Sequence, residues 1–482
     1  MNLANILLES ARKHPDRTAV AFYDRRIRYS ELRAAVLRFG AALREMGIAT
    51  GDRVAVALPN VPEFAVVYYG ALAAGAEVVC VNPMYTAREI GWFFDDARVK
   101  LAVAHPMFAA ESAEAASRRA VRLLYSDSMG DPAKFDVKAA VAGAPGEITP
   151  VDRHPRDTAM IVYTNACRGV PLGACLTHGG LEFDARVSSK VAMVFETDVF
   201  LSILPLFHAF SLTVCLNLPI ITGAATILHE MFKEQRAVET LRQEPISIFP
   251  AVPTMYHRIL KEFGGRGLDF SSVRAFIPGG APPTYPDLYR DFSSAFKAHV
   301  YEGYGITECG PVTSVNPIRS KESRSGSIGL PLDEVDVKIV DGACNELPRG
   351  ETGELAVRGE NVMEKYLNRP DETDNFLRDG WFLTGDLANL DRDGFIFLKG
   401  LKKRMAIVGG FNVYPAEVER ELGEHPAVRS CRVFGRPDET LGERVTAEVG
   451  LEPGAEVSSV ELQKFLRKAL APYKIPKPIY FV

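Results

Sequence analysis

Two short segments of the sequence bring together residue types with complementary chemistry. The first is Tyr304-Gly-Ile-Thr-Glu308, in which an aromatic ring, a hydroxyl and a carboxylate lie close together in the chain. The Tyr304 ring could stack on a base, the Thr307 hydroxyl could bind a phosphate oxygen, and the Glu308 carboxylate could hold a magnesium ion. The same letters also suit the start of a helix that Thr307 caps, and the segment alone leaves both interpretations open.

The second segment, Trp381-Phe-Leu-Thr-Gly-Asp386, is predicted to end a β-strand with an acidic residue beside a glycine. A carboxylate in that position could bind both hydroxyls of a ribose, as the acidic residue of a dinucleotide-binding fold does. A hairpin turn is the alternative, because Asp391 and Asp393-Gly394 follow shortly afterwards.

Weaker signals precede these two segments. Gly279-Gly280-Ala281-Pro282 follows an apolar run, where paired glycines let the backbone approach a ligand closely, although the same letters also form ordinary turns. His208 stands in the apolar run Leu204-Pro-Leu-Phe-His208, and by itself a core histidine with satisfied hydrogen bonds is the better interpretation. Neither signal assigns a function alone.

The stretch YTNACRGVPLGACLTH, residues 163–178, has the outline of a phosphate-binding loop without its binding groups. An apolar run leads into a turn with Gly169, Pro171 and Gly173, but the tip lacks the hydroxyls and the lysine that cradle phosphates. The tip reads Asn-Ala-Cys-Arg instead, and Leu172 occupies a position where a lysine would be useful. Cys167 could be a nucleophile, but the sequence places no base beside it.

These segments are predicted to lie on a framework of alternating strands and helices. Strand-like runs at 53–58 and 77–81 flank a helical pattern at 61–74, and the same rhythm continues to residue 278. Such alternation predicts an α/β fold of parallel-rich sheets covered by helices. After about residue 325, alternating runs with turn signals predict a small β-barrel-like part, and a small α+β unit follows from Val413.

A chain of 482 residues exceeds what one hydrophobic core usually serves, so at least two domains are expected. The polar, basic and glycine-containing stretch 399–404 indicates a hinge between them. We expect a large domain over residues 1–400, a hinge over 401–404 and a small domain over 405–482.

Composition narrows the classes of partner and compartment. The net charge of -5 gives no electrostatic reason to expect nucleic acid as a partner. The 7 cysteines contain no C-x-x-C pair, which argues against a disulfide framework or structural zinc and favours a reducing, cytoplasmic compartment. The apolar run 201–228 is long enough to span a bilayer, but its prolines, asparagine and glycine predict buried core and no transmembrane segment.

Taken in order, these segments resemble the adenylate-forming (AMP-binding) superfamily, which includes acyl- and aryl-CoA synthetases, peptide-synthetase adenylation domains and luciferases. Between residues 163 and 419 the motifs run YTNACRGVPLGACLTH, LPLFH, PGGAP, YGITE, GELAVRG, WFLTGD and KKRMAIVGGFNVYPAEVE. The chain is most similar to AMP-forming fatty-acyl-CoA ligases. The resemblance implies that a carboxylic acid attacks MgATP to give an acyl-adenylate and pyrophosphate. The small domain then rotates, and CoA displaces AMP.

The resemblance also assigns roles, and it makes Thr307, Glu308 and His208 catalytic. Tyr304 would stack on adenine, Thr307 would bind the α-phosphate, Glu308 would hold Mg²⁺, and Asp386 would bind the ribose. Thr164 and Gly169 would contact the nucleotide, and the acyl carboxylate would be bordered by His208, Gly279, Gly280 and Ala281. Phe207 and the segment 210–216 would line the acyl pocket. Gly409 and Gly410, with Lys402 or Lys403 nearby, would lie along the pantetheine path.

The sequence departs from the family pattern at positions that handle ATP. Leu172 replaces the lysine of the loop, Leu401 replaces an arginine that binds the ribose hydroxyls, and Arg404 replaces an aspartate usual at the hinge. The family's adenylating lysine lies downstream of the segment matching 472–482, so we expect a truncated small domain that ends before it. We therefore expect impaired adenylation and doubtful binding of the β- and γ-phosphates, although Arg168 could restore one positive charge.

Three interpretations of function stay open at this point. The first is a ligase that forms the CoA thioester of a carboxylic acid, of the fatty-acid type, with a slow adenylation step. The second is a catalytically inactive homologue that binds an acyl group, an adenylate or a partner protein. The third is acyl transfer that starts from a supplied adenylate. The sequence gives neither the acyl chain length nor a preference for aliphatic or aromatic acids.

Overall fold

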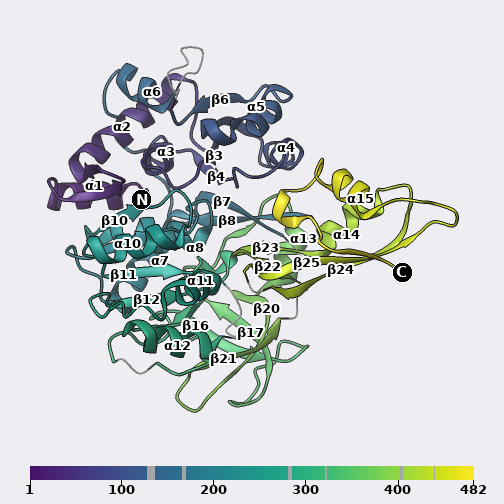
Figure 1. Cartoon of the computed structure of the whole chain (residues 1–482). Coiled ribbons are helices and arrows are strands. Elements are labelled where there is room, and N and C mark those ends of the chain that lie inside the picture. Colours follow the sequence, from purple (N-terminus) through teal and green to yellow (C-terminus); the bar gives the residue numbers. More distant parts are fainter. Residues whose placement is uncertain (128–135, 166–169, 281–284, 321–322, 402–404, 439) are drawn as a thin grey trace.

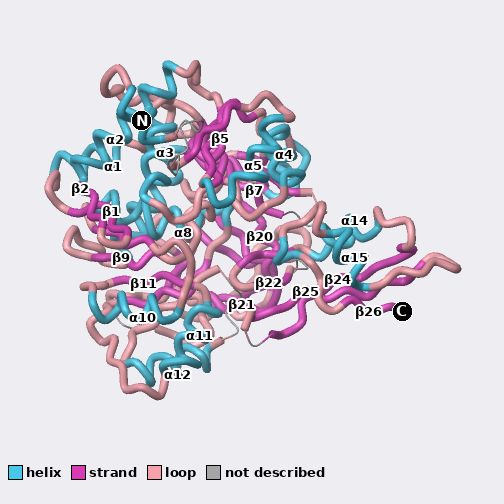
Figure 2. The backbone as a smooth tube through the Cα atoms, turned by 45° about the horizontal axis from the view of Figure 1, so that its top comes forward, coloured by secondary structure: helices cyan, strands magenta, loops and turns pink. Residues whose placement is uncertain are grey.

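Two sheets rich in parallel strands, with helices against their faces, form the N-terminal part of the molecule (Figure 1). This computed structural model describes residues 1–127, 136–165, 170–280, 285–320, 323–401, 405–438 and 440–482. An antiparallel region follows the two sheets, and a small domain projects from one side of the molecule and carries the C-terminus (Figures 1 and 2). The predicted fold class is confirmed.

The first sheet has six strands in the order β12-β11-β9-β10-β1-β2. Its neighbours are parallel except for the β1–β2 pair, which is antiparallel. The strands are β1 (Thr18–Phe22), β2 (Arg25–Arg28), β9 (Val199–Ser202), β10 (Ala225–Leu228), β11 (Ile248–Ala251) and β12 (Ala275–Pro278). Nearly all residues of β9 to β12 are buried, as expected of parallel strands covered on both faces.

The second sheet has seven strands in the order β18-β8-β7-β4-β3-β5-β6. The four strands β4, β3, β5 and β6 run parallel, and β8 turns back antiparallel to β7. The strands are β3 (Arg53–Ala57), β4 (Glu77–Cys80), β5 (Val99–Ala104), β6 (Arg122–Tyr125), β7 (Thr158–Asn165), β8 (Pro171–Thr177) and β18 (Lys365–Tyr366). The described strands of the loop-like stretch, β7 and β8, are therefore an antiparallel pair within this sheet, with β18 on the outer side of β8.

Helices pack on these sheets through apolar faces. The helix α3 is apolar almost all round, and all its residues except Glu63 are buried, which suits a helix enclosed by other elements. The helices of this part are α1 (Asn5–Lys13), α2 (Tyr29–Glu45), α3 (Pro62–Ala73), α4 (Ala87–Asp96), α5 (Ala109–Ser117), α6 (Val137–Gly143), α7 (His178–Val191), α10 (Glu234–Gln243), α11 (Pro253–Phe263) and α12 (Pro286–Phe296).

The long apolar run 201–228 is core, as its sequence predicts, and it is divided into strand, helical segment and strand. Between β9 and β10 lie α8 (Ala209–Leu212), a π-helical turn (Thr213–Asn217) and α9 (Leu218–Thr222). The π-helical turn is completely buried. Among the helices described, none combines the length and the apolar character that crossing a membrane requires.

The antiparallel region consists of two further sheets. One has β13 (Gly303–Tyr304), β14 (Ser314–Val315) and β15 (Leu330–Pro331). The other joins β16 (Asp336–Val340), β17 (Gly353–Arg358), β19 (Leu377–Arg378), β20 (Trp381–Leu390) and β21 (Ile396–Leu401), with α13 (Pro370–Phe376) leading into β19. Asp386 does not end its strand as predicted. It lies within β20, after Gly385 at φ +74°, and the register with β21 shifts at the next residues.

The small domain has its own sheet and its own hydrophobic core. Its elements are β22 (Ala406–Val408), β23 (Phe411–Val413), α14 (Pro415–Gly423), β24 (Val428–Asp438), β25 (Gly442–Leu451), α15 (Ser459–Leu466) and β26 (Ile479–Phe481). The strand β21 ends at Leu401 and β22 begins at Ala406, and residues 402–404 lie outside the described residues. The hinge over 401–404 stays a prediction.

Candidate functional site

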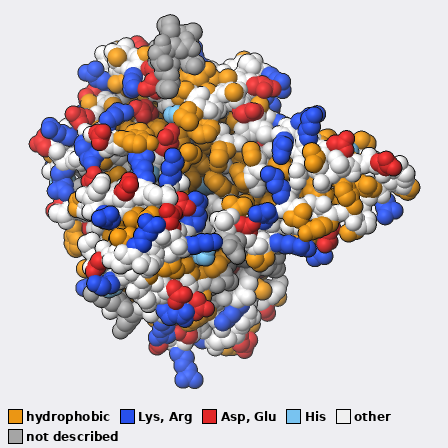
Figure 3. All heavy atoms as spheres, in the orientation of Figure 1, with side chains coloured by type: hydrophobic (Ala, Val, Ile, Leu, Met, Phe, Trp, Pro, Cys, Tyr) orange, Lys and Arg blue, Asp and Glu red, His pale blue; other side chains and the backbone are white. Residues whose placement is uncertain are grey.

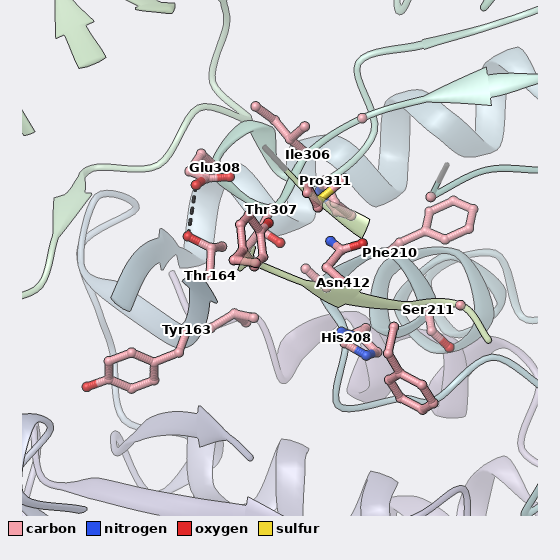
Figure 4. A pocket seen from close by; sticks show the side chains of 18 of the residues that line it. Tyr163, Thr164, His208, Phe210, Ser211, Ile306, Thr307, Glu308, Pro311 and Asn412 are labelled. Carbon is pink, nitrogen blue, oxygen red and sulfur yellow. Dashed lines mark hydrogen bonds between the residues drawn. The ribbon is translucent and has the colours of Figure 1, made fainter. Parts of the chain in front are cut away.

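A cavity of about 240 Å³ lies where the antiparallel region, the two sheets and the small domain meet. The hairpin β7–β8, the segment after β9, the loop after β13, strand β20 and strand β23 each contribute residues to its wall. Figure 4 shows Thr164, His208, Thr307, Glu308 and Asn412 around this cavity, while the Tyr163 ring points away from it. Apolar side chains gather along the hollow between the large and small domains (Figure 3).

Tyr304 and Asp386, which the sequence predicts as adenine and ribose contacts, meet in this wall. The Tyr304 hydroxyl donates to Asp386 Oδ2 at 2.5 Å, a length typical of a hydrogen bond to a carboxylate. Both side chains are buried. Burial, followed by the nearby Asp386 charge, raises the pKa of the Tyr304 hydroxyl well above its usual value, so it stays a donor. This bond fixes the plane of the aromatic ring beside the cavity.

Glu308, the predicted Mg²⁺ ligand, is held by two hydroxyls. Thr164 Oγ1 donates to Glu308 Oε1 at 3.0 Å and the Tyr366 hydroxyl donates to the same oxygen at 2.8 Å. The short 3₁₀ turn Thr307–Cys309 carries Glu308, and its N-cap residue is Ile306, so Thr307 does not cap a helix. Thr307 lines the cavity beside Glu308 (Figure 4). A carboxylate with a neighbouring hydroxyl offers the oxygen ligands that Mg²⁺ prefers.

Leu172 faces the same cavity from the second strand of the hairpin. In the ladder between β7 and β8, Leu172 pairs with Thr164, so both side chains lie on one face of the sheet. Leu172 is only 4% exposed and belongs to the main hydrophobic core. The position at which the resemblance expects a lysine is thus filled by an aliphatic side chain.

His208 is a pocket residue, contrary to the core histidine that its sequence context favours. It follows the turn after β9 and lines the cavity, and its ring lies 4.8 Å from the Phe207 ring and 5.9 Å from the Phe411 ring, centroid to centroid. Its Nε2 atom is buried and has no hydrogen-bond partner among the described residues. Burial lowers the pKa of His208 to about 4, so the imidazole is neutral at physiological pH. In the wall of a cavity, such an atom is available to a ligand or to water.

A second, apolar cavity of about 60 Å³ adjoins the first. Its lining is largely aliphatic and aromatic, with Phe210, Val214 and Ile277 among the residues that form it. Phe210 lines both cavities, and the Phe210 ring lies 2.8 Å from the point where a side chain at Gly279 would begin. Gly279 therefore makes room for this ring. Gly280, at φ +75°, lines both cavities as well.

The small domain closes one side of the first cavity. Gly410, Phe411 and Asn412 line the cavity. Gly410 has φ +90°, and a side chain there would begin 3.2 Å from Val252 of the large domain. Gly409, the other glycine predicted for the pantetheine path, is absent from the described lining residues of this cavity. Phe207, predicted for the acyl pocket, is also absent from them, and its ring packs against the imidazole of His208.

The described lining of the first cavity has two carboxylates, Glu308 and Asp386, and neither a lysine nor an arginine. No group of three or more histidine, cysteine or acidic side chains that could bind a metal by itself occurs among the residues that the structure describes. A divalent cation here would need oxygen atoms from a substrate phosphate, which is how Mg²⁺ is usually bound.

Several predicted residues lie outside the described residues. These are Gly169 and Ala281 of the predicted site, Cys167 and Arg168 of the loop-like stretch of the sequence, and Lys402, Lys403 and Arg404 of the predicted hinge. The side chain of Leu401 is also outside them.

Sequence reasoning missed other residues of the site. Tyr366 reaches Glu308 because β18 pairs with β8, a contact that no local pattern reveals. Asn412 and Tyr473 of the small domain also line the cavity. Asn412 lies inside a motif that the resemblance uses, and this was the available signal for it.

Comparisons with known proteins agree with this geometry. The AMP-binding enzyme family matches residues 7–367, and the AMP-binding enzyme C-terminal domain matches residues 417–482. A long-chain-fatty-acid–CoA ligase from Bacillus subtilis (strain 168) is 33% identical over 99% of this chain and 90% of its own length. A feruloyl-CoA synthase from Amycolatopsis sp is 35% identical over 98% of this chain and 93% of its own length.

Two solved structures extend the comparison. A double mutant of o-succinylbenzoate CoA synthetase from Bacillus subtilis, bound with its product analogue OSB-NCoA, superposes with a TM-score of 0.89 at 27% identity, over 99% of this chain and 94% of that chain. ATP-bound MatB from Rhodopseudomonas palustris superposes with a TM-score of 0.78 at 31% identity, over 100% of this chain and 95% of that chain. The superposition on the chain that holds a CoA product analogue is thus better, although its identity is lower.

Proposed function

The chain belongs to the AMP-binding enzyme family, and from this premise we propose that it activates an apolar carboxylic acid as an acyl-adenylate and transfers the acyl group to CoA, with a weakened adenylation step. One observation carries the proposal. A single cavity is lined by Tyr304, Thr307, Glu308 and Asp386, together with His208, and an apolar cavity adjoins it. Enzymes of this family use ATP, Mg²⁺ and CoA.

The nucleotide half of the cavity suits an adenylate. The Tyr304 ring would stack on adenine, and Asp386 would bind the ribose, since a carboxylate can accept several hydrogen bonds at once. Thr307 would bind the α-phosphate. Both hydroxyl bonds to Glu308 end on Oε1, so Oε2 would be the ligand for Mg²⁺ that the nucleotide brings with it.

The acyl half favours an apolar acid. The inner cavity is lined by side chains such as Phe200, Val214 and Ile248. A neutral His208, which lines the first cavity, would donate a hydrogen bond to an acyl oxygen there. The relatives act on long-chain fatty acids and on ferulic acid, both of which combine a carboxylate with an apolar body. We place the substrate in this class.

Leu172 is the reason to expect slow adenylation. The pyrophosphate that leaves in this step carries several negative charges, and an aliphatic side chain at the hairpin gives them no counter-charge. Losing one such contact to a transferring group typically costs about 2.7–4 kcal/mol, or roughly a 100- to 1000-fold loss of rate. The CoA-dependent step needs no such contact and would be less affected.

The test separates the two steps. ATP–pyrophosphate exchange over a panel of aliphatic and aromatic acids measures adenylation, and CoA-thioester formation from synthetic acyl-adenylates measures the second step. We expect measurable thioester formation and slow exchange. Asp386→Asn should weaken binding of an acyl-adenylate analogue about tenfold by analogy with the loss of a charged hydrogen bond. Asp391→Asn, just after the same strand and outside the cavity, is the matched control.

The alternative is a catalytically inactive homologue that binds an acyl or adenylate ligand, or a partner protein. The substitutions at the positions that handle ATP favour it over a fast ligase. If acyl-adenylate analogues bind but neither step is detected, this alternative replaces the ligase proposal. If neither binding nor turnover is found for any acid, both small-molecule proposals fail.

A further inference from the structure

A buried lysine joins the small domain to the large one. Lys474, in the 3₁₀ turn Pro472–Lys474, donates from Nζ to Glu89 Oε1 and to Glu417 Oε1, each at 2.8 Å. The side chains of the three residues are 2%, 9% and 5% exposed. Glu89 belongs to α4 of the large domain, whereas Lys474 and Glu417 both belong to the small domain. One of the two ion pairs therefore crosses the domain interface.

Glu89 is held firmly by its own domain. Its second oxygen, Oε2, accepts hydrogen bonds from the Thr86 backbone N–H and the Thr86 hydroxyl, each at 2.9 Å, in a capping box at the start of α4. The Ala469 carbonyl oxygen of the small domain lies 3.3 Å from the same hydroxyl, as the weaker, alternative acceptor of its one proton. Thr86 and Glu89, which cap α4 of the large domain, thus both contact the small domain.

Neighbouring aromatic rings connect this ion pair to the first cavity of the candidate site. The Tyr473 ring stacks on the Phe411 ring at 4.7 Å and 25°. Phe411 lies in β23, lines the cavity and approaches the His208 ring. The residue that precedes Lys474 therefore supports the strand that closes the cavity.

The pair between Lys474 and Glu89 can exist only in this orientation of the domains. If the small domain rotates away, Lys474 leaves together with Glu417, and Glu89 stays with Thr86. Replacing Glu89 in this orientation leaves the buried Lys474 ammonium with Glu417 as its remaining partner and removes the charge that binds it to the large domain, which is unfavourable. In the separated orientation both groups become hydrated, so the same replacement costs little there. A substitution at this pair consequently shifts the balance between the two orientations.

We propose that Lys474, through its bond to Glu89, is a positioning residue that holds the small domain in the orientation in which Gly410, Phe411 and Asn412 close the catalytic cavity, and that it thereby promotes the CoA-dependent step and not adenylation. This inference rests on the proposed function for its catalytic consequence. The orientation itself does not depend on that function.

The kinetic test uses Glu89→Gln and Lys474→Met in the full chain. Glu89→Gln removes the charge on the large-domain side and leaves the small domain intact, so it is the decisive variant if Lys474→Met folds poorly. We expect thioester formation from a synthetic acyl-adenylate to fall about 10- to 100-fold, as for loss of a buried pair. The affinity for a nonhydrolysable acyl-adenylate analogue should change less than threefold.

Arg88→Gln is the matched control. Arg88 pairs across the same interface with Glu421 at 2.9 Å, but its side chain is 63% exposed. The Glu421 side chain is 5% exposed, but it also pairs with Arg420 at 3.0 Å, so losing the exposed Arg88 leaves it compensated. This variant should therefore keep both thioester formation and analogue binding within about threefold of the wild type.

A distance measurement tests the orientation without turnover. Spin labels on non-natural amino acids at Met231 of the large domain and Val460 of the small domain, both exposed, should give one narrow distance distribution in the wild type and in Arg88→Gln. Glu89→Gln should broaden or shift it. An unchanged distribution in Glu89→Gln overturns the inference whatever the kinetics show. If the wild type forms no thioester but Glu89→Gln still shifts the distances, the proposed function fails and the positioning role stands.

Discussion

At the scale of single residues, Leu172 is the side chain on which the proposed weakening of adenylation depends. It lies opposite Thr164 in the hairpin, next to the hydroxyl that binds Glu308. A lysine at this position would place its ammonium in a cavity whose described lining has two carboxylates and no cation. The site would then gain the charge that a leaving pyrophosphate needs, as the lysines of phosphate-binding loops provide.

We therefore predict that Leu172→Lys accelerates adenylation. The rate of ATP–pyrophosphate exchange should rise about 10- to 100-fold, a part of the effect of one charged contact to a transferring group. Thioester formation from a supplied acyl-adenylate should change little. Because Leu172 is buried, the variant should also unfold at a lower temperature, which a thermal melt will reveal.

Leu172→Met is the matched control for this prediction, since it keeps the volume and adds no charge. If Leu172→Met and Leu172→Lys exchange pyrophosphate at the same rate, charge at this position does not limit adenylation. A slow adenylation step would then have to be explained by other residues.

At the scale of elements, the segment between β9 and β10 shapes the acyl half of the site. Helix α8 carries Phe210, and the π-helical turn carries Val214, so that both side chains reach the inner cavity. The extra residue in a π turn redirects the side chains that follow it, and such turns occur often at functional sites. Phe210 lines both the inner cavity and the outer one, so its ring borders the passage between them.

We predict that Phe210→Ala shifts substrate preference toward longer or bulkier acids. An inner cavity of about 60 Å³ has room for only a few carbon atoms, and removing the ring would join it to the outer cavity. Each additional buried methylene contributes about 0.8 kcal/mol. The ratio of kcat/KM for a twelve-carbon acid to that for a six-carbon acid should therefore increase at least tenfold.

Val214→Ala enlarges only the inner cavity and serves as the comparison for Phe210→Ala. It should give a smaller change in the same ratio. A ratio that does not respond to Phe210→Ala would mean that the acyl chain takes another path, and thermal melts of both variants will show whether the fold is kept.

Elements with a regular pattern could be predicted from the sequence. The strand-like runs at 53–58 and 77–81 form β3 and β4, and the helical pattern at 61–74 forms α3. Asp386 was placed wrongly at a strand end, because a glycine before an acidic residue is typical of a turn. In the structure Gly385 takes a positive φ inside the strand, and the local register shift lets Asp386 reach Tyr304.

At the scale of the whole molecule, the features that could not be predicted from the sequence depend on contacts between segments far apart in the chain. His208 has a core-like sequence context, yet the packing of the small-domain strand with Phe411 makes it part of a pocket wall. Lys474 and Glu89 are separated by 385 positions, and neither belongs to a motif. Motifs identified several residues that line the cavity, such as Tyr304, Glu308 and Asp386. The orientation of the domains could not be predicted, since it depends on pairs such as the one between Lys474 and Glu89.

Buried ionisable groups should also make the stability of the whole molecule depend on pH. Burial raises the pKa of Asp184 to about 8, although the Val312 backbone N–H donates to its carboxylate at 2.9 Å. An unfolded aspartate has a pKa near ~3.9. The folded state therefore binds more protons between these two values, and the free energy of unfolding decreases as pH rises from about 4 to 8.

Three histidines have the opposite effect at lower pH. Burial lowers the pKa of His178 to about 3 and those of His208 and His229 to about 4. Because unfolded histidines bind protons near pH ~6.5, the stability that comes from keeping these rings neutral is complete above that pH. It is lost as pH falls from there toward 3. The two effects together predict that the protein is most stable at mildly acidic to neutral pH.

Asp184→Asn isolates the first effect. Asparagine keeps the size of the side chain and an oxygen that can accept from Val312, and its amide group can donate to Ser188, whose hydroxyl lies 3.1 Å from the carboxylate. Asparagine does not titrate, so the variant should lack the part of the decrease in the free energy of unfolding that Asp184 causes between about pH 4 and 8. The difference in melting temperature between the variant and the wild type should be small at pH 5 and should grow through pH 6.5 to pH 8.

Glu302→Gln gives an independent comparison, because burial also raises the pKa of Glu302 to about 8. The variant should show the same increase with pH, since its carboxyl group is protonated in the folded state over the same range. A difference in melting temperature that stays constant from pH 5 to pH 8 for Asp184→Asn would mean that this carboxyl group is ionised in the folded protein. The Val312 and Ser188 hydrogen bonds would then outweigh the cost of burying its charge.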